Sequence, residues 1–161
     1  VGAVQNRPIV IDSESGLGND SLYRINWIHD AIFANKNYLS SIKHKWVFDT
    51  LPVLVGKKEK ESSKLVQLVL PEATEELRID SKLSQTCRAC KRKKFLPPNG
   101  GYFPPLQSEQ EAAPMFCSKE RFGTESIAWS AIIVNADLGN KLLGEKRTKI
   151  KLIPLEGSVN N

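Results

Sequence analysis

No uninterrupted apolar run in this chain is longer than a β-strand. The longest runs, at 131–134 and 53–55 with their neighbours, fall far short of the roughly 20 residues that a membrane-spanning helix needs. Hydrophobic residues still make up 40% of the 161 residues, and charged residues 25%. This balance is typical of a globular chain with one sizeable core. We therefore expect a single domain over residues 1–161 that does not associate with a membrane.

The spacing of apolar residues predicts one helix near the start of the chain. Leu22, Ile25, Ile28 and Ile32 recur at three- and four-residue intervals, which places them on one face of a helix of about 14 residues. Residues 1–20, with one short apolar run, are expected to form a strand or extended arm and a loop.

The rest of the chain favours strands. Short runs rich in Val, Leu and Ile, bounded by Gly, Pro and polar residues, predict strands, and these lie at 47–55, 65–70, 126–136 and 149–152. A polar hairpin-type loop is expected at 57–63, a helical turn at 72–77 and a turn at 137–140. The fold class predicted is α+β and mostly β, with an N-terminal helix.

Positive charge is densest in one short segment, and a second basic group lies at 146–151. The chain has 23 Lys and Arg against 18 Asp and Glu, a net charge of +5, which favours nucleic acid, anionic lipid or an acidic protein as partner. Five cations fall within seven residues: Arg88, Lys91, Arg92, Lys93 and Lys94. Such a run is typical of a phosphate-binding surface, of a nuclear localisation signal, or of a solvated loop.

Aromatic residues lie directly beside this cluster. Phe95, Tyr102 and Phe103 follow it in the sequence, and single-stranded nucleic acid binds by stacking its bases on aromatic side chains next to a basic groove. Alternatively, the same side chains pack the neighbouring Pro-rich loop onto the core. The candidate nucleic-acid-binding residues are therefore the five cations and these three aromatics.

Three cysteines suggest a second kind of site. Cys87 and Cys90 are spaced so that both thiolates can face one tetrahedral zinc ion, and Cys117 lies 27 residues after Cys90. Glu120 occupies the position that would complete a second CxxC motif. These four residues are the candidate zinc ligands, and 87–120 is expected to be a loop or zinc-knuckle insertion. Reduced structural cysteines and a redox CxxC are the alternatives. An odd number of cysteines favours a reducing compartment, the cytosol or nucleus.

The order of these motifs resembles a known family. The incomplete knuckle pair at Cys87, Cys90 and Cys117, followed by the strand-like segment 126–137, is similar to the zinc-ribbon-bearing oligonucleotide/oligosaccharide-binding (OB) folds of the replication protein A large-subunit type. The resemblance covers about 60 residues. It implies an OB-like barrel, with a small mixed sheet as the alternative, and a Cys-bearing loop insertion.

These observations predict a nucleic-acid-binding module for single-stranded DNA or RNA, acting within a larger nuclear assembly. One alternative is a protein-interaction or structural subunit of a large complex with no nucleic-acid contact. Another is a small enzyme with a cysteine nucleophile, in which His29 or His44 activates Cys117 and Asp49 orients the histidine. No P-loop, GxGxxG or HExxH motif is present in the sequence, so we expect no catalytic residues.

Overall fold

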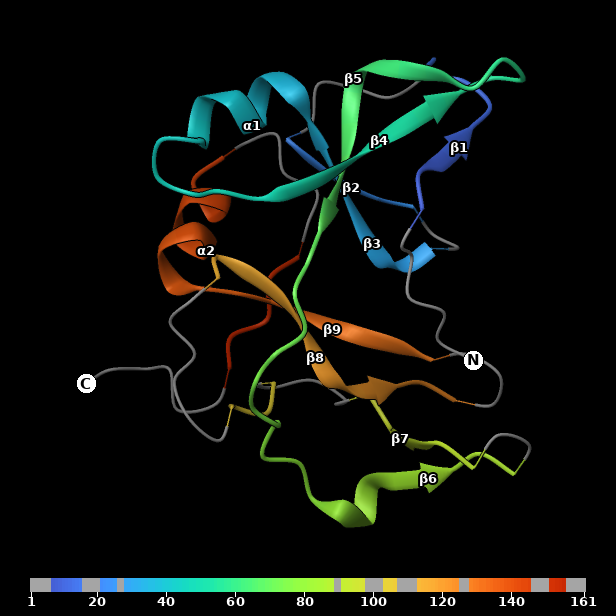
Figure 1. Cartoon of the computed structure of the whole chain (residues 1–161). Coiled ribbons are helices and arrows are strands. Elements are labelled where there is room, and N and C mark those ends of the chain that lie inside the picture. The colour runs from blue at the N-terminus through green and yellow to red at the C-terminus, as the bar shows by residue number, and fades with distance from the viewer. Residues whose placement is uncertain are drawn as a thin grey trace. The chain divides into compact units, whose positions relative to one another are not determined.

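The structure is a computed structural model that describes residues 7–15, 21–25, 28–88, 91–97, 103–106, 113–124, 128–145 and 151–155. Its strands are β1 (Ile9–Ile11), β2 (Leu22–Ile25), β3 (Ile28–Asn35), β4 (Asp49–Val55), β5 (Lys60–Val69), β6 (Ser84–Thr86), β7 (Lys93–Phe95), β8 (Met115–Phe122) and β9 (Trp129–Val134). Its helices are α1 (Lys36–Ile42), α2 (Ala136–Leu143) and a 3-10 turn, η1 (Ser81–Leu83). Figure 1 shows these elements.

The chain forms two compact units. The β1–β5 unit consists of Val4–Leu70 and Ala136–Ile150, and the β6–β9 unit consists of Val1–Ala3, Pro71–Asn135 and Lys151–Asn161. Neither unit is one continuous segment, because the chain passes from one to the other several times. A single domain would unfold in one cooperative step, and the single domain expected from the sequence stays a prediction.

The β1–β5 unit contains a curled sheet of five strands in the order β1-β4-β5-β3-β2 (Figure 1). β1 pairs with β4 in parallel, and the other neighbours are antiparallel, so the sheet is mixed. Its described core contains Ile9, Ala31, Phe33, Val53 and Leu65, all buried. Most of these residues are β-branched or aromatic, side chains that pack well on a pleated surface.

A wide bulge interrupts the β4–β5 ladder, and a distant carboxylate holds it. The register shifts between Pro52↔Val66 and Leu54↔Glu61. The Ser62 hydroxyl donates a hydrogen bond to Glu14 and accepts one from the backbone N–H of Leu65 at 2.7 Å. Ser62 is buried, so these bonds satisfy polar groups that the ladder leaves unpaired.

The predicted helix at 22–32 is wrong. This segment forms the antiparallel strands β2 and β3, with Leu22 opposite Ala34 and Ile25 opposite Ile28. Tyr23 and the isoleucines favour strands, and short apolar runs do not by themselves distinguish a helical from a strand period. The chain's first helix comes later. Asn35 ends β3 and caps α1 by accepting hydrogen bonds from the N–H groups of Asn37 and Tyr38.

Helix α2 replaces the turn that was predicted at 137–140. Leu138 and Leu142 lie four residues apart on this helix and are both buried. Burial of an apolar stripe stabilises a short helix more than local propensity does, which explains why Gly139 and Asn140 do not end it. The Ser21 hydroxyl donates to the Glu145 carboxylate at 3.0 Å, just beyond the helix.

β4, β5 and β9 confirm the strands predicted at 47–55, 65–70 and 126–136. β5 begins earlier than predicted, at Lys60. The turn predicted at 72–77 is not helical, because this segment makes isolated β-bridges at Glu72 and Leu77. Of the strand predicted at 149–152, the described residues 151 and 152 lie outside any strand.

The β6–β9 unit contains a four-stranded mixed sheet in the order β6-β7-β8-β9. β7 and most of β8 lie in the segment 87–120, for which the sequence predicted only a loop or knuckle insertion. Between Cys117 and Arg121 the β8–β9 register shifts. Ser118 holds this irregularity, because its fully buried hydroxyl accepts from the N–H of Ala131 at 2.9 Å and donates to the carbonyl of Glu120 at 2.9 Å.

Both units are built mainly from strands, which confirms the predicted α+β, mostly β fold class. Each unit has its own described core; that of the β6–β9 unit includes Phe116, Phe122 and Ile133. No helix in the described part of the chain is long and apolar enough to span a bilayer.

Candidate nucleic-acid interface

The basic segment of the sequence forms a β-hairpin. β6 and β7 pair antiparallel through Ser84↔Phe95, Gln85↔Lys94 and Thr86↔Lys93. The N–H of Cys87 donates to the carbonyl of Arg92 at 2.9 Å, which extends the ladder by one pair. We call residues 84–95 the basic hairpin.

A tight turn closes the basic hairpin. The N–H of Lys91 donates to the carbonyl of Cys87 at 2.9 Å. Lys91 has a φ of 59°, a left-handed conformation that is uncommon for a residue with a side chain. The turn therefore has a cation at each end. Arg88 comes directly after Cys87, and Arg92 comes directly after Lys91.

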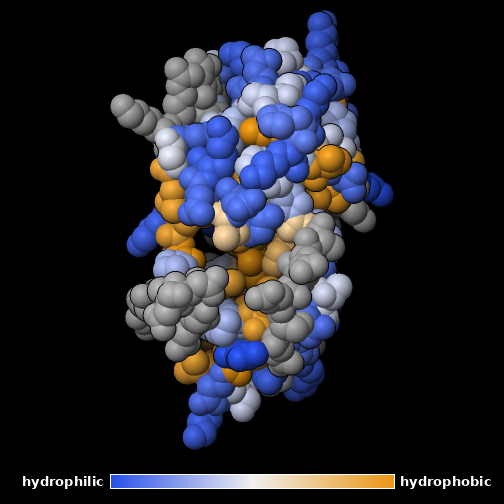
Figure 2. Space-filling model, turned by 90° about the vertical axis from the view of Figure 1, so that its left-hand side faces the viewer, coloured by the Kyte–Doolittle hydropathy of each residue, from blue (hydrophilic) through white to orange (hydrophobic). Residues whose placement is uncertain are grey.

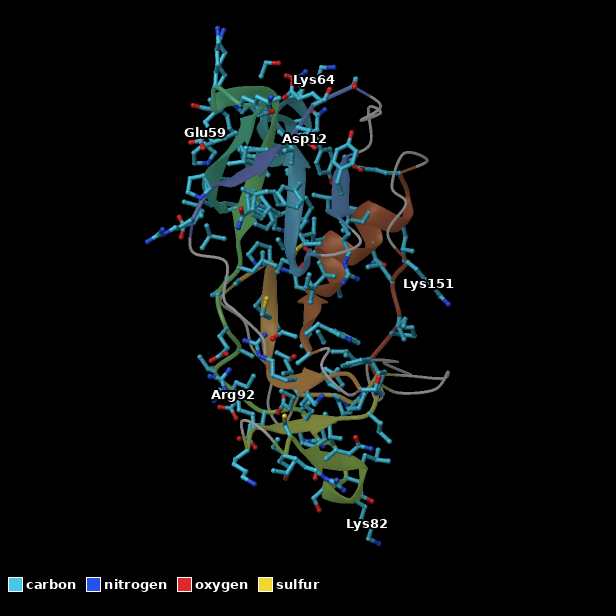
Figure 3. All side chains as sticks on the ribbon, turned by 90° about the vertical axis from the view of Figure 1, so that its right-hand side faces the viewer. Asp12, Glu59, Lys64, Lys82, Arg92 and Lys151 are labelled. Atoms are coloured by element: carbon cyan, nitrogen blue, oxygen red, sulfur yellow. The ribbon has the colours of Figure 1, made fainter. Side chains whose placement is uncertain are left out.

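Four of the five predicted cations are exposed. They are Arg88, Lys91, Arg92 and Lys93. In Figure 3 the labelled Arg92 and Lys82 lie at the surface of the β6–β9 unit. Lys94 differs, since it is only 3% exposed. Side chains alternate along a strand, so Lys94 faces the opposite side from Lys93 and Phe95 and does not present its charge to solvent.

The charge around the basic hairpin has a single sign over a long stretch. Residues 81–108 contain Lys82 and the five predicted cations, and no Asp or Glu. Cations this close repel one another, and a bound polyanion offsets that repulsion. The nearest acidic residue on the N-terminal side is Asp80, whose side chain caps η1 by accepting from the N–H of Lys82 at 2.9 Å.

The aromatic residues beside the cations lie in the core. Phe95 is half-buried and packs against the core cluster, with its ring centroid 6.3 Å from that of Phe122. The Lys93 ammonium lies 5.0 Å from the centroid of the Phe95 ring, within range of a cation–π interaction. Phe103 is also half-buried, 5.2 Å from Phe122 between ring centroids. Tyr102 lies outside the described residues.

Those candidate zinc ligands that the structure describes do not form a group that could hold a metal ion. Cys87 and Cys117 are free cysteines and half-buried, Cys87 in the turn of the basic hairpin and Cys117 in β8. Cys90 lies outside the described residues. Among the residues that are described, no three His, Cys, Asp or Glu side chains are placed to share a metal ion. Zinc stays a prediction, and its test is the metal content of the protein.

Glu120 has a different partner. Its side chain is buried, and its Oε1 accepts a hydrogen bond from the backbone N–H of Leu77 at 2.8 Å. This bond joins the 73–77 segment to the irregular part of β8. The sequence offered no signal for this contact, because the two residues are 43 positions apart.

The residues of the alternative cysteine-nucleophile site fall in different units. Cys117 belongs to the β6–β9 unit, and His44 and Asp49 to the β1–β5 unit. His44 is exposed just after α1, and Asp49 is exposed at the start of β4. The side chain of His29 lies outside the described part.

Comparison of the chain with protein-family models, with curated proteins and with solved structures gave no match.

Proposed function

We propose that this protein binds nucleic acid through the basic hairpin, as one module of a larger nuclear assembly. The observation that carries the proposal is the exposure of Arg88, Lys91, Arg92 and Lys93 on one hairpin. Lys and Arg side chains that contact phosphates release condensed counterions, and this release supplies most of the non-specific affinity for nucleic acid.

Exposed apolar side chains give less support to the alternative of a protein-interaction subunit. The face in Figure 2 carries hydrophilic residues together with several groups of hydrophobic residues. Val47, Leu143 and Ile153 are the most exposed large apolar side chains in the described part, at 80%, 68% and 52%. Single exposed apolar residues are normal on a monomer and do not by themselves mark an interface.

We also propose that the β1–β5 sheet is arranged as in an OB fold. The sheet has five strands and is curled (Figure 1), as the strands of a partly open OB barrel are. The residues that carry the resemblance, 87–137, contribute β7, β8 and β9 of the other unit. Closure of β1 against β2 would make the barrel, and amide protection in both edge strands by hydrogen exchange would support it.

A charge-removal experiment tests the proposed function. The hairpin variant carries Arg88→Gln, Lys91→Asn and Lys93→Gln; Asn suits the left-handed conformation at position 91. Its matched control is Lys57→Gln, Lys58→Gln and Lys60→Gln, three exposed cations on the β4–β5 hairpin of the other unit. Both variants lose three charges.

Fluorescence anisotropy with a labelled oligonucleotide is expected to show at least about tenfold weaker binding for the hairpin variant at moderate salt. The control variant should stay within about twofold of the unmodified protein. Equal binding by the hairpin variant and the unmodified protein, with both folded by circular dichroism, would contradict the proposal and favour the protein-interaction alternative.

A further inference from the structure

The aromatic side chains of the β6–β9 unit are already in use by its core. The described aromatic residues there either belong to one apolar cluster or pack against it: Phe95, Phe103, Phe116, Phe122 and Trp129. The rings of Phe103 and Trp129 lie 5.2 Å and 5.3 Å from Phe122 between centroids. Phe116 and Phe122 are buried, and Phe95, Phe103 and Trp129 are half-buried with part of each ring in the core, so these described rings offer limited area for a nucleic-acid base.

Phe95 is closest to the cations, and its ring has neighbours in two directions. Phe122 lies 6.3 Å from it between ring centroids, and the Lys93 ammonium lies 5.0 Å from its centroid. Phe95 and Lys93 are two residues apart on β7, so both project from the same face of the strand. A base that stacks on the ring face covered by the Lys93 ammonium would displace that ammonium, which is itself a phosphate-binding group.

This arrangement bears on which form of nucleic acid the hairpin binds. Proteins that bind single strands rely on stacking, which contributes about 1–3 kcal/mol per base. Where the described rings beside the cations offer little area for stacking, the strength of binding depends more on the density of phosphates. Duplex DNA carries one charge per roughly 1.7 Å of helix axis, against about 3.4 Å for each strand alone.

The shape of the basic hairpin also suits a duplex. Its two strands are spaced by about 4.8 Å, as in any β-ladder, and the major groove of B-DNA, roughly 12 Å wide, admits a two-stranded β-ribbon. Gln85 and Thr86 on β6 are exposed and can hydrogen-bond to phosphates or base edges. β7 pairs with β8 at one position, Phe95↔Phe122, so the described ladder with β8 involves the base of the hairpin and not its turn.

We infer that the ligand of the basic hairpin is duplex DNA, held through its phosphates and not through base stacking. This inference rests on the proposed function, and it replaces the single-stranded ligand predicted from the sequence with a double-stranded one. The phosphate-binding groups are the exposed cations Arg88, Lys91, Arg92 and Lys93.

A paired titration tests the inference. One labelled DNA strand of roughly 20 nucleotides and mixed sequence is measured by anisotropy alone and after annealing to its complement, at about 100 mM salt, and we expect the duplex to bind at least about fivefold more tightly. In the variant Phe103→Leu we expect a lower midpoint of thermal unfolding and an unchanged ratio of duplex to single-strand affinity. Single-strand affinity equal to or greater than duplex affinity would overturn the inference.

The hairpin variant separates failure of this inference from failure of the proposed function. If the hairpin variant binds both DNA forms as the unmodified protein does, the hairpin is not the binding site and both proposals fail. If it binds weakly while the unmodified protein prefers the single strand, the proposed function holds and the duplex inference alone fails. The expected result is weaker binding of both forms, with the greater loss for the duplex.

Discussion

The buried carboxylate of Glu120 accepts a hydrogen bond from the backbone N–H of Leu77 at 2.8 Å. Leu77 belongs to the core of the β6–β9 unit, and Glu120 lies in the irregular part of β8. Loss of this acceptor leaves a buried N–H without a partner, so we expect Glu120→Ala to lower the free energy of unfolding by about 2–3 kcal/mol.

The matched control is Glu76→Ala, which removes an exposed carboxylate from the same 73–77 segment. Its effect should stay within about 0.5 kcal/mol. Urea unfolding followed by circular dichroism measures both variants. Equal stability of Glu120→Ala and the unmodified protein would show that the Leu77 contact does not hold this segment.

Acid should weaken the contact between Glu14 and the β5 bulge. The hydrogen bond from Ser62 lowers the pKa of Glu14 below its ordinary value of 4.5. Partial burial opposes this shift and contacts with Lys64 and Ser63 add to it, so that the net shift of the pKa is downward. A carboxylate whose pKa is lowered by folding stabilises the protein fully above the unfolded pKa, and this stabilisation is lost as the pH falls through the folded pKa.

We therefore expect Glu14→Gln to unfold at a lower temperature than the unmodified protein near neutral pH, and the difference to shrink below about pH 4.5. Glu59→Gln, a change at an exposed glutamate of the β4–β5 turn, is the control. Thermal unfolding from pH 7 to 3 measures the effect. A difference that is constant over this range would rule out the hydrogen-bonded carboxylate as its source.

Zinc is tested by metal analysis. The spacing of Cys87, Cys90 and Cys117 predicts about one zinc ion per chain, and Cys87→Ser should lose it together with several kcal/mol of stability. Metal-free protein with unchanged thermal unfolding after treatment with a chelator would remove zinc from this account.

The single-domain prediction concerns how the two units unfold. Each unit has a core residue that is almost fully buried, Phe122 in one and Phe33 in the other. Because the chain crosses between the units several times, we expect one calorimetric transition. Phe122→Ala and Phe33→Ala should each lower the temperature of this whole transition, with a loss of about 3–5 kcal/mol in the free energy of unfolding. Two separate transitions, each sensitive to one variant, would show two domains.

The sequence predicted strands well where short Val- and Leu-rich runs end in Gly or Pro, as at β4. It failed for Leu22–Ile25 and Ile28–Asn35, where apolar spacing fits a helix and pairing between two strands decides the outcome. It missed α2 because burial of Leu138 and Leu142 outweighs the low helix propensity of Gly139.

The candidate site was predicted in part. The position of the basic cluster could be read from the sequence, since no acidic residue interrupts it. The burial of Lys94 requires knowing that residues 93–95 form a strand, because only then do neighbouring cations face opposite sides. The packing of Phe95 and Phe103 against Phe122 depends on long-range contacts that local sequence does not encode.

The salt dependence of DNA binding reports how many phosphates the basic hairpin contacts. Each phosphate neutralised by a Lys or Arg contributes about −0.9 to the slope of log affinity against log salt for duplex DNA. Removing the charges of Arg88, Lys91 and Lys93 should therefore make the slope shallower by about two to three units, measured between about 50 and 200 mM salt. The control that removes Lys57, Lys58 and Lys60 should leave it unchanged. Equal slopes for the hairpin variant and the unmodified protein would contradict the claim that the basic hairpin binds phosphates.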